Sequence, residues 1–294
     1  MTSGILLIDK NTGASSGKIV YQARRELGIK KIGHAGTLDP LATGLLPLLI
    51  NKATRVSDFL MDEVKIYETL AFFGQKTDSQ DITGEILERS SKTFELDDLK
   101  KAIDENFVGE ILQTPPMYSA LKHKGKKLYE LAREGKSVER KKRKIKIYDF
   151  EIIDFNFPYA RLRISCSKGT YIRTLVNDLG EILQTFATVK ELRRIKVGDF
   201  DVKDAIKMED FEKMQADQII KNLIPIDKAL CQYEKIVLDK SYYKQATNGM
   251  TMKVDYGKNV DNYLRVYVGD LFIGLGEYKD ENKTSKIKKV FYER

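Results

Sequence analysis

Residues 33–48, GHAGTLDPLATGLLPL, hold one acidic side chain in a loop that otherwise has no formal charge. Asp39 is the only formally charged residue in positions 33–51, so it does not belong to a solvated surface run. A residue before proline is pushed toward extended backbone, and Gly36 and Gly44 allow close approach of another backbone or a ligand. Taken alone, the pattern fits either a reactive carboxylate or an Asx-type turn in which Asp39 caps a following helix.

Length and composition predict a globular chain with room for two domains, since 42% of the 294 residues are hydrophobic. The first ten residues, MTSGILLIDK, contain too short an apolar run for a signal peptide, so a cytoplasmic location is the default expectation. The two cysteines, Cys166 and Cys231, lie far apart, and the two histidines are His34 and His123. This spacing argues against a metal site built from cysteine and histidine.

Most of the positive charge is concentrated in one segment. Residues 122–146 contain twelve Lys or Arg and three Glu, a local net charge of +9, whereas the whole chain carries +8. The run RKKRK at 140–144 is its densest part. A solvated loop without a partner is one interpretation, but a polyphosphate such as a nucleic acid explains the concentration better.

Periodicity predicts a mixed α+β fold with a largely antiparallel sheet. The elements expected in the first part are a strand at 4–8, a helix at 17–27 capped by Ser16 and ended by Gly28, a strand at 65–73, a helix at 96–107, strands at 145–155 and 160–166, and a helix from Ile172 to Leu183 with Ile182 on its core face. From about residue 233 the pattern changes to that of a small β domain. Its expected strands lie at 236–238, 264–268, 271–275 and 289–292, with turns at Gly249, Gly257 and Gly269.

The segment at 33–48 resembles the signature of the TruB family, the tRNA pseudouridine-55 synthases. Other segments that resemble the family follow in the expected order: KIY at 65–67, GQKTD at 74–78 with Asp81 and Gly84, PMYSALK at 116–122, GKKLYE at 125–130, SKGTYIR at 167–173 and LRR at 192–194. One departure is Asn51, where the family pattern has glycine. Asparagine is the residue best able to replace glycine at positive φ, so this departure casts little doubt on activity.

The resemblance implies a pseudouridine synthase catalytic domain at 1–232, with a basic thumb insertion at about 115–147, and a small PUA-like RNA-binding domain at 233–294. It implies an isomerase that converts uridine to pseudouridine at position 55, in the T loop of tRNA. The partner would be the T arm of tRNA, and the enzyme would act as a monomer without an obligatory protein partner. The reaction needs no cofactor and no metal.

The resemblance also assigns catalytic roles. Asp39 would be the nucleophile, attacking C1′ of the ribose or C6 of the uracil, or assisting a glycal intermediate. Arg173 would be its ionic partner, and Tyr67 would stack on the target base and serve in proton transfer. Local sequence alone also allows a solvent-facing Arg173 and a core-packing Tyr67.

Further residues would contact the substrate. A base inside an RNA stack is unreachable, so the enzyme must flip it out, and His34 would fill the vacated place. The other expected contacts are Tyr171 and Leu192 with the flipped nucleotide, Asp81 with substrate groups or with Arg173, and Lys126 and Lys127 of the basic segment with RNA. A turn role for His34 and core packing for Tyr171 and Leu192 are the structural alternatives.

Two other functions compete with this hypothesis. The chain could be an RNA-binding or tRNA-folding protein on the same scaffold, with incidental catalysis, although such a module has no evident use for Asp39. It could also be a relative that works in a guide-RNA complex, but the chain lacks extended basic tails and has only a short C-terminal module.

Overall fold

The computed structural model describes residues 2–254, 256, 263–279, 281 and 283–292. Its largest element is a mixed sheet in which eight strands follow the order β14-β1-β3-β12-β4-β11-β10-β7, while β13 pairs with β12 and β2 with β3. The strands are β1 (Gly4–Lys10), β2 (Ile32–His34), β3 (Thr43–Ile50), β4 (Lys65–Phe73), β7 (Gly109–Gln113), β10 (Arg143–Asn156), β11 (Tyr159–Cys166), β12 (Ala187–Val197), β13 (Phe200–Asp201) and β14 (Ile206–Lys207). The pairs β1–β14 and β3–β12 are parallel and the other pairs are antiparallel. The expected fold class is therefore confirmed.

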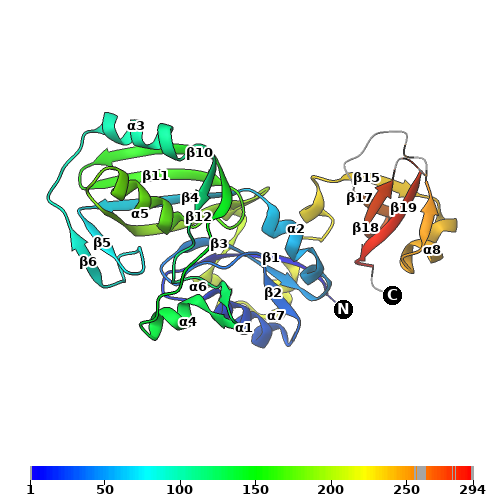
Figure 1. Ribbon diagram of the computed structural model, residues 1–294. Helices are drawn as coiled ribbons and strands as arrows, with labels where there is room; N and C mark the ends of the chain where they lie inside the picture. The colour runs from blue at the N-terminus through cyan, green and yellow to red at the C-terminus, as the bar shows by residue number, and fades with distance from the viewer. Residues whose placement is uncertain (1, 255, 257–262, 280, 282, 293–294) are drawn as a thin grey trace.

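Three longer helices surround this sheet: α1 (Ser16–Leu27), α3 (Leu96–Asn106) and α5 (Ile172–Ile182). Figure 1 shows α3 and α5 over the same part of the sheet, where β10, β11 and β4 lie. Along α5, the buried side chains of Leu175, Val176 and Leu179 join the main core, and each stabilises the fold by roughly 2 kcal/mol. The prediction for Ile182 was wrong, because its side chain is 43% exposed at the end of the helix.

The start of α1 differs from the prediction by one residue. Ser15, not Ser16, is the N-cap, and its side chain accepts a hydrogen bond from the backbone of Lys18. Ser16 is buried, and its hydroxyl accepts from the backbone N–H of Leu38 at 2.9 Å and donates to the carbonyl of the same residue. Two adjacent serines could each cap the helix, and this contact with the segment around Asp39 decides between them.

Short elements complete the first part of the chain, and a few of them contribute residues to the site described below. They are η1 (Asn51–Val56), α2 (Ser57–Asp62), β5 (Gln75–Thr77), β6 (Ile86–Arg89), β8 (Lys122–His123), β9 (Lys126–Lys127), α4 (Leu128–Arg133), η2 (Val202–Asp204), α6 (Met208–Phe211), α7 (Ala216–Lys221) and η3 (Lys228–Leu230). Strands β5 and β6 form one two-stranded ribbon, and β8 and β9 form another. Asn51 begins η1 at φ 52°, which confirms the expectation that it replaces glycine at positive φ.

The C-terminal part is a five-stranded sheet in the order β15-β17-β18-β19-β16, drawn in orange and red at the right of Figure 1. Its elements are β15 (Glu234–Leu238), η4 (Lys240–Tyr242), α8 (Tyr243–Thr247), β16 (Thr251–Lys253), β17 (Tyr263–Val268), β18 (Leu271–Lys279) and β19 (Thr284–Val290). The strand expected at 289–292 was placed too late, because β19 already begins at Thr284. Its lysines alternate with the inward Ser285 and Ile287 and so hide the apolar pattern. The turn expected at Gly257 lies outside the described residues.

The two sheets share a packed interface. Phe59 of α2 makes edge-to-face ring contacts with Tyr233 and with Tyr263 of β17. The hydroxyl of Tyr267 donates to Asp227 at 2.9 Å, and burial together with this hydrogen bond raises the pKa of Tyr267 to about 12. The smaller sheet is therefore fixed to the larger part of the molecule by aromatic packing and hydrogen bonds.

Candidate active site

The loop that carries Asp39 connects β2 to β3 and closes tightly at both ends. Gly36 has φ 103° and Gly44 has φ 98°, values that favour glycine. A Cβ atom on Gly44 would lie 2.3 Å from the carbonyl oxygen of Arg194, so this glycine does permit the close backbone approach expected from the sequence. A strand, not a helix, follows Asp39, which removes the helix-capping interpretation.

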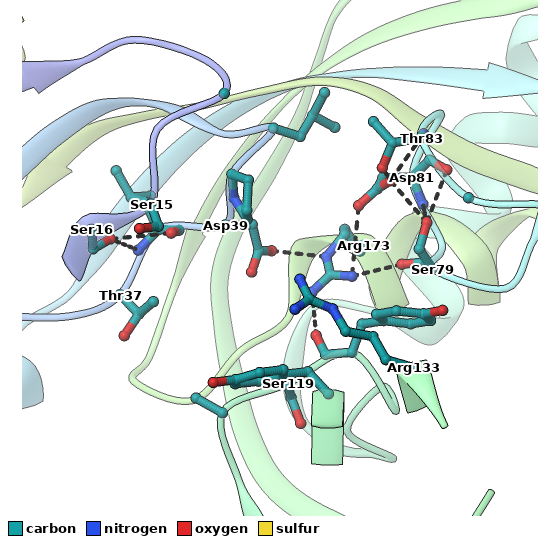
Figure 2. Close-up of a pocket in the computed structure, with 18 of the residues that line it drawn as sticks. Ser15, Ser16, Thr37, Asp39, Ser79, Asp81, Thr83, Ser119, Arg133 and Arg173 are labelled. Carbon is teal, nitrogen blue, oxygen red and sulfur yellow. Dashed lines mark hydrogen bonds and ion pairs between the residues drawn. The ribbon is translucent and has the colours of Figure 1, made fainter. Parts of the chain in front are cut away.

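Arg173 lies in the first turn of α5 and is the ionic partner of Asp39. Its Nε is 2.8 Å from Oδ2 of Asp39, and its side chain is 4% exposed compared with 37% for Asp39. The other guanidinium nitrogens donate to two main-chain carbonyls, Nη1 to Ser79 at 2.6 Å and Nη2 to Tyr118 at 2.7 Å. Figure 2 shows Asp39 and Arg173 pointing toward each other. Three separate segments thus fix the guanidinium, which in turn orients the carboxylate.

Asp81 lies on the side of Arg173 that faces away from Asp39. Its Oδ2 is 3.7 Å from Nη1 of the arginine. Its Oδ1 accepts hydrogen bonds from the hydroxyl of Ser79 at 2.8 Å and from the backbone and hydroxyl of Thr83, at 3.0 and 2.6 Å. Figure 2 shows this cluster beside the guanidinium. The buried Asp81 is therefore committed to local bonds, whereas Asp39 keeps part of its surface open.

Two cavities meet at Asp39 and Arg173. One, of about 740 Å³, is also lined by Tyr67, Tyr171 and Leu192, together with Arg143, Lys144 and Arg194. The other, of about 820 Å³, is lined by His34, Asp81 and Lys127, together with Tyr129 and Arg133 of α4 and the first residues of α1. Of the nine expected site residues, the structure therefore places eight in the walls of these two cavities, Asp39 and Arg173 included.

Lys126, the ninth, does not line either cavity. Its Nζ lies 3.6 Å from a carboxylate oxygen of Glu134, and its side chain is mostly exposed. Its neighbour Lys127 turns inward, where its Nζ lies over the ring of Tyr129 at 5.3 Å from the centroid. Adjacent residues of β9 point to opposite sides, so only one of the two lysines reaches a cavity.

The aromatic side chains of the site are neutral near pH 7. Burial raises the pKa of both tyrosine phenols, Tyr67 and Tyr171, although the positive charge of Arg194 acts against this effect at Tyr67. Burial, assisted by the same guanidinium, lowers the pKa of His34. The Nδ1 atom of His34 is buried and has no hydrogen-bond partner within the described residues. A neutral imidazole and two neutral phenols are suited to stacking on bases.

Three buried cations around the site received no role from the sequence. Arg194 of β12 is hydrogen-bonded to the loop of Asp39, and Lys10 of β1 donates to the carbonyl of Pro40 at 3.2 Å. Lys65 of β4 donates to the carbonyl of Glu63 at 2.5 Å. Burial lowers the pKa of both lysines to about 8, and at Lys10 the nearby Asp39 opposes the decrease. A signal was present in the sequence for Lys10, which ends β1 on the same face of the strand as the buried Leu6 and Ile8.

Comparison with protein families identifies the chain. The model described as TruB family pseudouridylate synthase (N terminal domain) matches residues 24–172, which is half of the chain. A model of the tRNA pseudouridylate synthase B C-terminal domain matches residues 173–231. The chain belongs to the TruB family. It is accordingly a tRNA pseudouridine synthase, which is an isomerase.

Similar proteins agree with membership of the TruB family. The tRNA pseudouridine synthase B of Clostridium kluyveri is 41% identical over 281 residues, covering 94% of this chain and 96% of that protein. The protein of the same name from Endomicrobium trichonymphae is 48% identical over 224 residues, covering 76% and 96%. The similarity therefore extends over nearly the full length of both relatives.

Solved structures show the same fold at lower sequence identity. An H/ACA RNP bound to a substrate RNA containing 2′-deoxyuridine matches with a TM-score of 0.76 and 23% identity, covering 99% of this chain and 86% of that chain. A Cbf5-Nop10-Gar1 complex matches with a TM-score of 0.75 and 24% identity, covering 99% and 85%. Each alignment covers 99% of this TruB family chain and therefore includes both its large mixed sheet and its smaller C-terminal sheet.

Two absences concern the described residues. In that part of the chain, no group of three His, Cys, Asp or Glu side chains is placed to hold a metal ion. Across the same residues, no helix is both long and apolar enough to span a bilayer.

Proposed function

We propose that this enzyme isomerises uridine 55 in the T loop of tRNA and that Asp39 is its nucleophile. The ion pair between Asp39 and Arg173 carries the proposal, because it aims a partly open carboxylate into a cavity lined by Tyr67 and Tyr171. A uracil fits such a site, since the phenols offer stacking surfaces and a carboxylate lies within the same wall.

The reaction breaks the N-glycosidic bond, turns the uracil and joins C5 to C1′ of the same ribose. The proton on C5 is released and N1 gains one, so the substrate and the product have the same composition. Attack of Asp39 on C1′, attack on C6, and assistance to a glycal all require the oriented carboxylate. Arg173 keeps that group in place through its bonds to Ser79 and Tyr118.

The first cavity is assigned to the flipped uracil. Tyr67 is the stacking partner and takes part in proton transfer; its phenol is protonated at neutral pH, and burial raises its pKa further above the ordinary value. Tyr171 and Leu192 border the same space and retain the base after the glycosidic bond has opened. Retention matters because the loosened uracil must rotate without leaving.

The second cavity is assigned to the RNA strand from which the base is taken. His34 lines this cavity and is the residue that fills the vacated stack. Lys127 and Arg133 bring positive charge to its rim, while Arg143 and Lys144 bring charge to the first cavity. Asp81 acts on the substrate through Arg173 and not directly. The exposed Lys126 belongs to the outer phosphate-binding surface of the basic segment.

The remaining parts of the proposal concern the organisation of the enzyme. Residues 1–232 form the catalytic domain, with the thumb at about 115–147, and residues 233–294 form an RNA-binding domain of PUA type. The enzyme acts in the cytoplasm as a monomer, with tRNA as its partner and with neither a cofactor nor an obligatory protein partner.

The test uses tRNA transcripts carrying tritium at C5 of uridine, with no metal or cofactor added beyond the magnesium that folds the RNA. The wild-type enzyme should release about one equivalent of tritium per tRNA. A transcript in which uridine 55 is replaced by cytidine should release none. Release from the altered transcript would refute the assigned position, and tight binding of the normal transcript without release would favour the RNA-folding alternative.

A further inference from the structure

Arg194 contacts both ends of the loop that carries Asp39. Its Nη2 donates to the carbonyl of Gly36 at 3.0 Å, and its Nε donates to the carbonyl of Leu45 at 2.8 Å. Its backbone is paired with Gly44 in the parallel β3–β12 ladder. One residue therefore binds the loop where it begins, through its side chain, and where it ends, through its side chain and its main chain.

The two glycines of the loop fit Arg194 closely. A Cβ atom on Gly36 would lie 3.3 Å from Nη1 of the arginine, and one on Gly44 would lie 2.3 Å from its carbonyl oxygen. Both glycines also have positive φ, so neither position readily accepts another residue. The side chain of Arg194 is among the largest fully buried ones, at 1% exposure for the residue.

Arg194 also lies beside Tyr67. The two residues are direct partners in the antiparallel β4–β12 ladder, so their side chains point to the same face of the sheet. Both line the cavity that contains Asp39. The positive charge of the guanidinium opposes the effect of burial on the phenol, which supports the closeness of the two groups.

We propose that Arg194 is a positioning residue of the isomerisation, which holds the Asp39 loop and Tyr67 in fixed relative places. This inference rests on the proposed roles of Asp39 and Tyr67. The buried guanidinium acts through those two groups and need not touch the uridine. Its planar fork is required, because two acceptors, Gly36 and Leu45, must be reached in different directions at once.

The first variant is Arg194→Lys, which keeps the charge but replaces the fork by one ammonium group. At saturating enzyme, the single-turnover rate of tritium release should fall at least about tenfold, while the Kd for tRNA stays within about twofold. In Arg194→Gln, which also removes the charge, the rate of tritium release should fall further. Arg161→Gln is the matched control, since Arg161 is an exposed arginine of β11 in the same sheet whose Nη2 lies 3.3 Å from Glu191. Its rate should remain within about twofold of wild type.

Two outcomes would overturn the inference. One is a folded Arg194→Lys enzyme with a rate within twofold of wild type. The other is a lysine variant that fails to fold, or that loses affinity for tRNA as much as it loses rate, because either result makes Arg194 a general structural residue. Tritium release reports isomerisation at any uridine, so a wrong assignment of position 55 would appear only with the cytidine transcript and leaves this comparison intact.

Discussion

The Nε of Arg173 lies 2.8 Å from Oδ2 of Asp39, although helix α5 and the β2–β3 loop are far apart in the sequence. The same guanidinium also bonds to two main-chain carbonyls. Arg173→Lys offers one ammonium group to acceptors in three directions, so the single-turnover rate should fall about 100-fold or more. Rapid-quench measurement of tritium release checks this. Arg163→Lys is the control, because Arg163 is an exposed arginine that bridges Glu68 and Glu151. Equal loss in both variants would contradict a special role for Arg173.

Asp39→Asn removes the charge of the proposed nucleophile and keeps its shape. Turnover should drop by about 10⁴-fold or more, and the Kd for tRNA should change by less than about threefold. Filter binding and tritium release on the same preparation give the two values. Asp97→Asn, on the exposed face of α3, should behave as wild type. Turnover above about one hundredth of wild type would remove the assignment of Asp39.

Gly44→Ala tests the contact between β3 and β12. The added Cβ would lie 2.3 Å from the carbonyl oxygen of Arg194, so we expect a loss of at least about 3 kcal/mol in the free energy of unfolding. Gly28→Ala is the control, since Gly28 also has positive φ but has open space where a Cβ would be placed. Its cost should be about 1 kcal/mol from backbone strain alone. If urea denaturation gave similar losses of unfolding free energy for the two variants, backbone strain, and not the contact with Arg194, would dominate at position 44.

Lys65 predicts a pH dependence of stability. Burial lowers its pKa from 10.5 in the unfolded chain to about 8 in the folded protein. Between these values the unfolded state binds the extra proton, so this lysine makes the folded state more stable as the pH rises. In Lys65→Met, the rise in unfolding free energy between pH 8 and 9.5 should therefore be smaller by about 1.5 kcal/mol. Identical slopes of unfolding free energy against pH would contradict the expectation.

The basic segment predicts a salt-dependent affinity. Arg143 and Lys144 line a cavity, so Lys141 and Lys142 are the better residues for testing simple phosphate contacts. Changing both to Gln should reduce the slope of log Kd against log salt by about 1.5 to 2, because two fewer phosphates are neutralised. Changing Lys100 and Lys101 of α3 to Gln removes the same charge elsewhere and should leave the slope unchanged. An unaltered slope in the first variant would mean that these lysines only improve solubility.

Strong local patterns allowed much of the fold to be predicted. The strand expected at 65–73 coincides with β4, and the positive φ expected at Asn51 is present. Both follow from local physics, namely strand-forming side chains and the tolerance of asparagine for left-handed backbone. The meeting of Asp39 with Arg173 does not follow from local physics. That expectation came from the family resemblance, because nothing in either segment specifies the other.

Residues whose state depends on neighbouring strands could not be predicted. Arg194 lies in a strand rich in charged residues, KELRRIKV at 190–197, which looks like an exposed sequence. It is buried because β12 is an inner strand of the sheet and the loop of Asp39 lies against its side chain. Likewise, Ser15 and Ser16 are equivalent as helix caps until the contact of Ser16 with Leu38 is known. These outcomes are set by tertiary packing, which a single sequence does not display.

The aromatic packing of Phe59 against Tyr233 and Tyr263 fixes the position of the C-terminal sheet relative to the Asp39 cavities. The smaller sheet is held against the rest of the molecule at this junction, where Tyr267 also donates a hydrogen bond to Asp227. Any RNA that touches both the Asp39 cavities and the C-terminal sheet must therefore bridge a constant distance. If the C-terminal sheet binds RNA as proposed, the length of a bound stem, and not its sequence alone, would decide whether a uridine reaches Asp39.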